Sequence, residues 1–145
     1  MNSEDTQAVF RRAVNVLLIS PCEEDHRLVR DILKQSNWQP HSARTQKEAF
    51  DFLRENVAPV AICEGQLPDG NWQEVLAQFG RMQCPPMLVV TSLMADDRLW
   101  SEVLNLGGYN VLAKPLNTKE LFHVAGTAWM AWKQRWEGRA LARTA

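Results

Sequence analysis

The sequence lacks the features that would indicate a membrane protein, a secreted scaffold or a nucleic-acid surface. No stretch approaches the roughly 20 consecutive apolar residues that cross a bilayer. The N-terminal residues do not contain the apolar core of a signal peptide. Lys and Arg total 16 against 17 Asp and Glu, so the basic excess that nucleic acids attract is absent. We therefore expect a cytoplasmic protein that binds neither nucleic acid nor membrane.

Cysteines are few, and the signatures of common enzyme sites are missing. The three cysteines are an odd number without a paired framework, and no Cys-x-x-Cys or histidine at ligand spacing occurs. We interpret them as inert thiols, although a redox or metal role for Cys22 and Cys63 stays open. Gly107-Gly108 precedes a predicted strand, not a helix, so it is not a phosphate loop. With no nucleophile–base pair in evidence, we expect neither enzyme activity nor a cofactor.

Apolar residues make up 46% of the chain, and they fall into strand-like runs that alternate with helical stripes. The predicted strands span residues 14–19, 39–43, 58–63, 86–90 and 109–113. Capping boxes at Thr45 and Asn117 predict the starts of two of the five helices. Such βα repeats predict an α/β fold: a three-layer, doubly wound, flavodoxin-like sandwich with a parallel sheet in the order 2-1-3-4-5. The polar second strand is expected at the sheet edge.

A chain of 145 residues is the size of one domain, and it contains no internal repeat or linker. We divide it into an N-terminal segment, residues 1–13, a domain, residues 14–128, and an extension of the last helix with a tail, residues 129–145. We expect no separate output domain.

Polar residues close several of the apolar runs. Glu64 ends the run 58–63, and Leu67-Pro68-Asp69-Gly70 follows shortly after it. Thr91 closes the next run, and Lys114-Pro115 closes the last. In a parallel sheet these carboxyl ends share one edge, where doubly wound folds place their sites.

This order and spacing resembles the response-regulator receiver (CheY-like) family over about residues 15–128. In that family an aspartate in the place of Glu64 accepts a phosphoryl group. The resemblance implies that Glu64 is the phosphoacceptor equivalent. It also implies that Thr91, Lys114 and Pro115 are the equivalents of the phosphate-site residues, with the bond before the proline often cis.

The chain departs from the family at the acidic pair that follows the first strand and helps to hold Mg²⁺. Pro21 and Cys22 stand there, and neither offers the oxygen ligand that Mg²⁺ requires. Glu23 matches a frequent third acid, but we favour residues 23–25 as ordinary first-turn acids of a helix. Binding of Mg²⁺ is therefore not expected.

A further departure is the switch aromatic on the fifth strand, whose position holds Val111. Tyr109 lies two residues earlier, so strand alternation predicts that it shares the face of Val111. The usual coupling between the threonine and an aromatic ring is therefore in question.

Three interpretations of Glu64 stay open. It mimics a permanently charged state by pairing with Lys114 and accepting a hydrogen bond from Thr91, it is a solvated acid at the rim, or it is still phosphorylated. Thr91 also fits ordinary strand propensity, and Lys114 fits a solvated lysine before a turn.

The last helix carries Trp129, Trp132 and Trp136 on one stripe. Either this stripe packs on the domain itself, or it forms an apolar interface for a signalling partner or for a second copy in a dimer.

These observations predict a degenerate pseudo-receiver in two-component (phosphorelay) signalling, which acts by protein–protein contact without phosphorylation. Its contact surface would involve the fourth and fifth strands, the helix that starts near Asp96 and the last helix. One alternative is a receiver phosphorylated by an unorthodox route. Another is a flavodoxin-like sensor that binds a small ligand in the emptied acidic pocket.

Overall fold

A computed structural model of the chain describes residues 14–34 and 36–137. The predicted N-terminal segment, residues 1–13, and the end of the predicted tail, residues 138–145, lie outside the described residues.

The centre of the fold is a five-stranded parallel sheet in the order β2-β1-β3-β6-β7, which confirms the predicted order of the five main strands. The strands of this sheet are β1 (Val14–Ile19), β2 (Trp38–Ala43), β3 (Val60–Glu64), β6 (Met87–Ser92) and β7 (Asn110–Ala113). A small antiparallel pair, β4 (Gln66–Leu67) and β5 (Gly70–Asn71), follows β3. This pair was not predicted, because two-residue strands are too short to show a periodic pattern.

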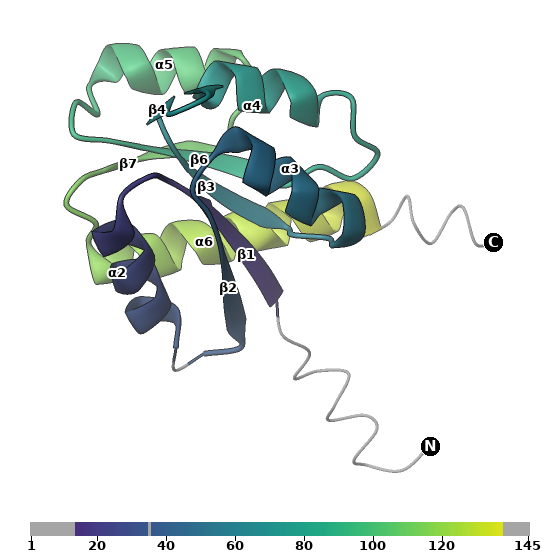
Figure 1. The fold of residues 1–145 in the computed structure, drawn as a ribbon, viewed down its shortest axis with the longest axis horizontal. Helices are drawn as coiled ribbons and strands as arrows, with labels where there is room; N and C mark the ends of the chain where they lie inside the picture. Colours follow the sequence, from purple (N-terminus) through teal and green to yellow (C-terminus); the bar gives the residue numbers. More distant parts are fainter. Residues whose placement is uncertain (1–13, 35, 138–145) are drawn as a thin grey trace.

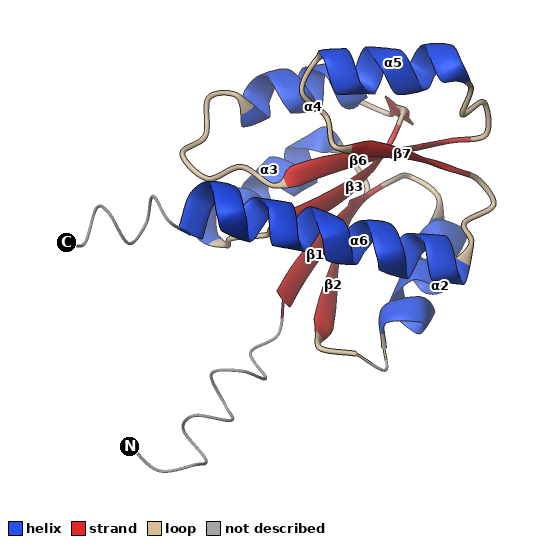
Figure 2. Ribbon diagram, turned by 180° about the vertical axis from the view of Figure 1, so that it is seen from behind, coloured by secondary structure: helices blue, strands red, loops and turns tan. Residues whose placement is uncertain are grey.

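Helices cover both faces of the sheet, so the predicted three-layer, doubly wound architecture is confirmed (Figures 1 and 2). The helices are α2 (Glu23–Leu33), α3 (Gln46–Glu55), α4 (Trp72–Phe79), α5 (Asp97–Asn105) and α6 (Thr118–Trp132), which continues into the π-helical turn η1 (Lys133–Glu137). In both views α3, α4 and α5 lie on one face, and α2 and α6 lie on the other. Within the described part of the chain, none of these helices has the length and apolar character needed to span a membrane.

Two hydrophobic clusters fill the spaces between the layers. Alternate residues of β1 serve opposite faces: Leu17 and Ile19 join the cluster under α3, α4 and α5, and Val16 and Leu18 join the cluster under α2 and α6. All four are at most 3% exposed, because a central parallel strand is covered on both sides. This burial explains why β1 reads as an almost unbroken apolar run.

The helix ends follow the local signals in the sequence. Thr45 Oγ1 accepts a hydrogen bond from the Glu48 backbone N–H at 3.1 Å, and Asn117 Oδ1 accepts one from the Glu120 N–H at 3.0 Å. Both predicted caps are therefore confirmed. Just beyond α5, Gly107 has a φ of 102°, a left-handed conformation that glycine adopts without strain.

The prediction for Tyr109 is wrong. Tyr109 packs against the cluster under α2 and α6, whereas Val111 belongs to the cluster on the opposite face. Strand alternation relates residues within a strand, and β7 begins only at Asn110.

Candidate functional site

Strand register brings the carboxyl ends of β1, β3, β6 and β7 to one edge of the sheet. Glu64 at the end of β3 pairs with Thr91 of β6, and the backbone N–H of Lys114 donates to the Ser92 carbonyl at 3.0 Å. On the other side of β3, Ile19 of β1 pairs with Cys63. The segments after β1, β3 and β7 therefore meet at this edge.

Lys114 joins two carboxylates at the centre of this edge. Its Nζ lies 3.1 Å from both carboxylate oxygens of Glu64 and 2.6 Å from Oδ2 of Asp25. The side chains of Lys114 and Asp25 are each 12% exposed, and that of Glu64 is 21% exposed. Burial lowers the pKa of Lys114, but hydrogen bonds to Asp25 and Glu64 outweigh this effect and raise the pKa above its ordinary value. The ammonium therefore stays charged.

Ser20 is the residue of the β1–α2 connection that faces Glu64. Its fully buried hydroxyl lies 2.9 Å from Glu64 Oε2 and 3.4 Å from Asp25 Oδ2, and it accepts the Cys22 backbone N–H at 3.0 Å. The single hydroxyl proton serves the shorter contact, to Glu64. Pro21 is exposed, so the residue after β1 that contacts Glu64 is Ser20, one residue before the predicted positions Pro21 and Cys22. The signal was available, because Ser20 directly follows the last residue of β1.

The acid that enters the site from α2 is Asp25, not Glu23. Glu23 is exposed and pairs with Arg44 at 2.5 Å, and this hydrogen bond lowers the pKa of Glu23. Asp25 is buried, as are Val29 and Leu33 further along the same helical stripe. That spacing of four residues was the signal that an acid at position 25 points inward.

A buried histidine supports the β1–α2 connection. His26 is 2% exposed, and its Nε2 lies 2.7 Å from the Ser20 carbonyl, so this nitrogen carries the proton that is donated. Its Nδ1 lies 2.8 Å from the Ser42 hydroxyl of β2. His26 therefore fixes the backbone of Ser20, the residue whose hydroxyl contacts Glu64.

The remaining predicted site residues lie nearby with different contacts. Thr91 is 2% exposed, but it is not among the partners that the described residues provide to Glu64. Val111 is 8% exposed and faces the cluster under α3, α4 and α5. The Lys114–Pro115 peptide bond is cis. Of the two contacts that the charge-mimic interpretation of Glu64 requires, the structure contains the one with Lys114 and not the one with Thr91.

The residues present do not fit a Mg²⁺ ion. Over residues 14–34 and 36–137, no group of three or more His, Cys, Asp or Glu side chains is placed to hold a metal. The two carboxylates that converge on the site, Asp25 and Glu64, already share the Lys114 ammonium. A metal ion on the same oxygens would have to displace this ammonium.

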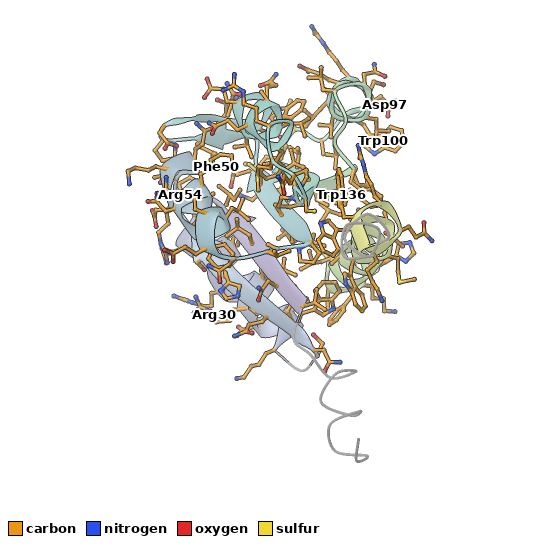
Figure 3. All side chains as sticks on the ribbon, turned by 90° about the vertical axis from the view of Figure 1, so that its right-hand side faces the viewer. Arg30, Phe50, Arg54, Asp97, Trp100 and Trp136 are labelled. Carbon is orange, nitrogen blue, oxygen red and sulfur yellow. The ribbon has the colours of Figure 1, made fainter. Side chains whose placement is uncertain are left out.

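The predicted tryptophan stripe is largely used by the domain itself. Trp129 packs against the cluster under α2 and α6, with its ring centroid 5.8 Å from that of Trp38 in an edge-to-face contact. Trp136 is 8% exposed, and Figure 3 shows it on the side of α6 turned toward the rest of the domain. Trp132 is half-buried. Trp100 on α5, by contrast, is 48% exposed, although its Nε1 donates a hydrogen bond to Asn110 of β7 (Figure 3).

No family model and no curated protein matches the sequence. Solved structures, however, share the fold over most of its length. The signal receiver domain of an HD domain-containing protein from Pseudomonas fluorescens Pf-5 has a TM-score of 0.78 at 21% identity, over 87% of this chain and 93% of that chain. The signal receiver domain of a putative Luxo repressor protein from Vibrio parahaemolyticus has a TM-score of 0.79 at 19% identity, over 85% and 95%.

A third similar structure is the beryllofluoride-activated NtrC4 receiver domain dimer, with a TM-score of 0.75 at 19% identity, over 81% of this chain and 98% of that chain. The structural neighbours of this chain are thus response-regulator receiver domains, and the chain has their fold.

Proposed function

We propose that this chain is an atypical receiver domain that works in the cytoplasm as a non-enzymatic protein-interaction module and does not depend on phosphorylation. The observation that carries the proposal is the contact of the Lys114 ammonium with both carboxylate oxygens of Glu64, at 3.1 Å each. The three cysteines, none of them in a disulfide, agree with a reducing compartment.

The proposal gives Glu64 the role of a permanent charge. Its carboxylate receives hydrogen bonds from Lys114 and Ser20, so the groups that would meet an incoming phosphoryl oxygen are already engaged. The cluster links β3 to α2 and to the segment between β7 and α6, because Asp25 and Lys114 belong to those elements. The cluster thereby favours one arrangement of β3, α2 and the segment between β7 and α6 without phosphorylation.

The output surface that we propose runs across α5, the edge strand β7 and α6. Its exposed apolar side chains are Trp100, Leu104 and Leu106 beside α5 and Met130 on α6, with exposed fractions of 48%, 37%, 56% and 51%. Aromatic residues and methionine are enriched in protein interfaces relative to the rest of a protein surface, which supports an interface here. Trp129 and Trp132 add their partly exposed edges.

A shallow, open depression on α6 gives this surface some relief. Tyr109, Phe122, Gly126 and Met130 are among its lining residues, and an added Cβ at Gly126 would meet no atom within 4 Å. Such a depression can receive a side chain from a signalling partner or from a second copy of the chain.

Amide chemical-shift mapping with Mg²⁺ and beryllofluoride, which stands in for a phosphoryl group, tests the proposal. We expect the signals of Ser20, Glu64 and Lys114 to stay unchanged, because neither the metal nor the anion finds free partners. Saturable shifts that spread from these residues to α6 would sink the proposal and favour phosphorylation by an unorthodox route.

A paired variant tests the role of the charge itself. Glu64→Gln removes the charge that holds Lys114, so we expect amide shifts at the start of α6 and along β7. Glu55→Gln, an exposed acid at the end of α3, serves as the matched control and should change only its own surroundings. Equal, local effects of the two variants would contradict a role of Glu64 in setting the surface.

A further inference from the structure

One cation and two anions from three separate elements converge at the edge of the sheet. Asp25 comes from α2, Glu64 ends β3, and Lys114 follows β7. The Lys114 ammonium lies 2.6 Å from Asp25 Oδ2 and 3.1 Å from Glu64 Oε2, and each of the three side chains is at most 21% exposed. The cluster keeps one negative charge in excess, because two carboxylates share a single ammonium.

The ammonium uses its full hydrogen-bonding capacity in this cluster. A lysine has three N–H donors, and Lys114 Nζ lies within bonding distance of three oxygens: Asp25 Oδ2 and both oxygens of Glu64. The buried hydroxyl oxygen of Ser20 lies 2.9 Å from Glu64 and 3.4 Å from Asp25. Three carboxylate oxygens therefore surround the ammonium, and the Ser20 hydroxyl contacts the same two carboxylates.

Carboxylate and hydroxyl oxygens at such spacing are also the ligands that hard divalent cations prefer. We propose that Lys114 is a built-in cation, which fills an oxygen site formed by Asp25, Glu64 and Ser20, and that withdrawing its ammonium turns this site into one that binds a divalent metal ion. The inference rests on the proposed function, in which the site takes no phosphoryl group, and it names what fills the site instead. The alternative explanation is that Lys114 only forms a structural ion pair. In that case removal of its ammonium would not create metal binding.

The test titrates Mn²⁺, and separately Mg²⁺, into the full chain and follows amide signals. Mn²⁺ broadens the signals of nearby residues because it is paramagnetic. In the unaltered chain we expect no selective broadening at Ser20, Asp25 or Glu64. In Lys114→Ala we expect saturable broadening centred on these three residues, since two carboxylates then face each other without a counter-ion.

Two further variants locate the effect. Lys119→Ala removes an exposed lysine at the start of α6 and should behave like the unaltered chain. Asp25→Asn combined with Lys114→Ala should bind Mn²⁺ about tenfold more weakly than Lys114→Ala alone, because ligand charge sets the affinity of such sites. Broadening of Asp25 and Glu64 in the unaltered chain, or no gain in Lys114→Ala, overturns the inference.

Thermal unfolding keeps the inference testable if Lys114→Ala folds poorly. Lys114→Ala removes the ion pairs with both Asp25 and Glu64, whereas Asp25→Asn removes only one of them. Asp25→Asn should therefore lower the Tm less than Lys114→Ala does. The reverse order overturns the inference. In folded Lys114→Ala, Mn²⁺ should raise the Tm, because an ion that binds the folded state stabilises it.

Failure of this inference is distinguishable from failure of the proposed function. A response of the unaltered chain to Mg²⁺ with beryllofluoride contradicts the proposed function. No such response, together with no gain of Mn²⁺ binding in Lys114→Ala, contradicts the built-in cation alone.

Discussion

At the scale of single residues, Cys63 shows how strongly burial separates three chemically identical thiols. Cys63 is fully buried in β3, and burial, with a smaller effect of the neighbouring Glu64 charge, raises the pKa of its thiol to about 12. Cys22 and Cys84 are partly exposed. A thiol acts as a nucleophile only when it is deprotonated, so Cys63 is inert at neutral pH.

We predict that iodoacetamide labels Cys22 and Cys84 of the folded chain at pH 8 and leaves Cys63 unlabelled. Peptide mass mapping after a short reaction measures this difference. Labelling of Cys63 at the rate found for the other two would show that β3 opens readily.

The same residue predicts a loss of stability at alkaline pH. In the unfolded chain the thiol ionises near its ordinary pKa of 9.0, while in the folded chain it ionises near 12. The unfolded state therefore loses its proton first, so the contribution is complete below pH 9 and falls as the pH rises toward 12. Denaturant unfolding across this range should show a shallower loss for Cys63→Ala, and an unchanged slope would refute the attribution.

Ser20 and Thr91 form a matched pair of buried hydroxyls beside Glu64, of which Ser20 alone is within hydrogen-bonding distance of that carboxylate. We predict that Ser20→Ala lowers the free energy of unfolding by about 2 kcal/mol, because it removes a hydrogen bond to a charged group. Thr91→Val should cost less than half as much. Urea denaturation measures both values, and a larger cost for Thr91→Val would restore Thr91 as the main partner.

At the scale of elements, α3 is tied to the hairpin that follows β3. Thr45 caps the helix locally, and Asp69 from the turn between β4 and β5 accepts the backbone N–H groups of Gln46 and Lys47 at 2.8 and 3.0 Å. A carboxylate at a helix N-terminus is favourable because the free N–H groups there carry partial positive charge. This link holds the hairpin next to the site against α3.

Substitution by alanine is expected to have opposite effects on stability at Gly126, within α6, and at Gly108, which follows α5. A Cβ at Gly126 in α6 would meet no atom within 4 Å, so Gly126→Ala should raise the free energy of unfolding by about 0.5–1 kcal/mol through helix propensity. A Cβ at Gly108 would lie 2.5 Å from Val103 Cγ1, so Gly108→Ala should destabilise the fold. Thermal and urea denaturation test both, and a destabilised Gly126→Ala variant would contradict the open space seen there.

At the scale of the whole molecule, the proposed surface across α5, β7 and α6 contains one large aromatic ring, Trp100, that is 48% exposed. Trp100 is held there by a hydrogen bond of 3.1 Å from its Nε1 to Asn110 Oδ1 of β7, so a large ring is fixed in an exposed position. Fixed, exposed aromatic rings are typical anchors of protein interfaces.

We predict that raising the protein concentration shifts amide signals on this side, through self-association, and that Trp100→Ser combined with Met130→Ser removes the shifts. Val57→Ser is the control, since Val57 is 57% exposed and lies outside these elements, just before β3. Shifts confined to other surfaces would contradict the proposed face. Absence of any concentration dependence would exclude the second copy and leave a different signalling protein as the partner.

The sequence by itself determined the order of the elements and the edge at which the site lies. Hydrophobic period distinguishes strand from helix locally, and the caps at Thr45 and Asn117 mark helix starts through contacts only three residues apart. Right-handed crossovers then restrict the sheet order, and the carboxyl-end positions of Glu64 and Lys114 follow from it. These features rest on local or topological rules, which the sequence expresses directly.

Only the tertiary structure decided which groups contact one another at that edge. Ser20 rather than Pro21, and Asp25 rather than Glu23, contacts the site residues. Which of them does so depends on how the β1–α2 connection and α2 are rotated relative to β3. A shift of one residue turns a side chain from the site to solvent, and hydrophobic patterns locate element ends less finely than that. Trp136 is likewise buried within η1, which the stripe of tryptophans in the sequence does not reveal.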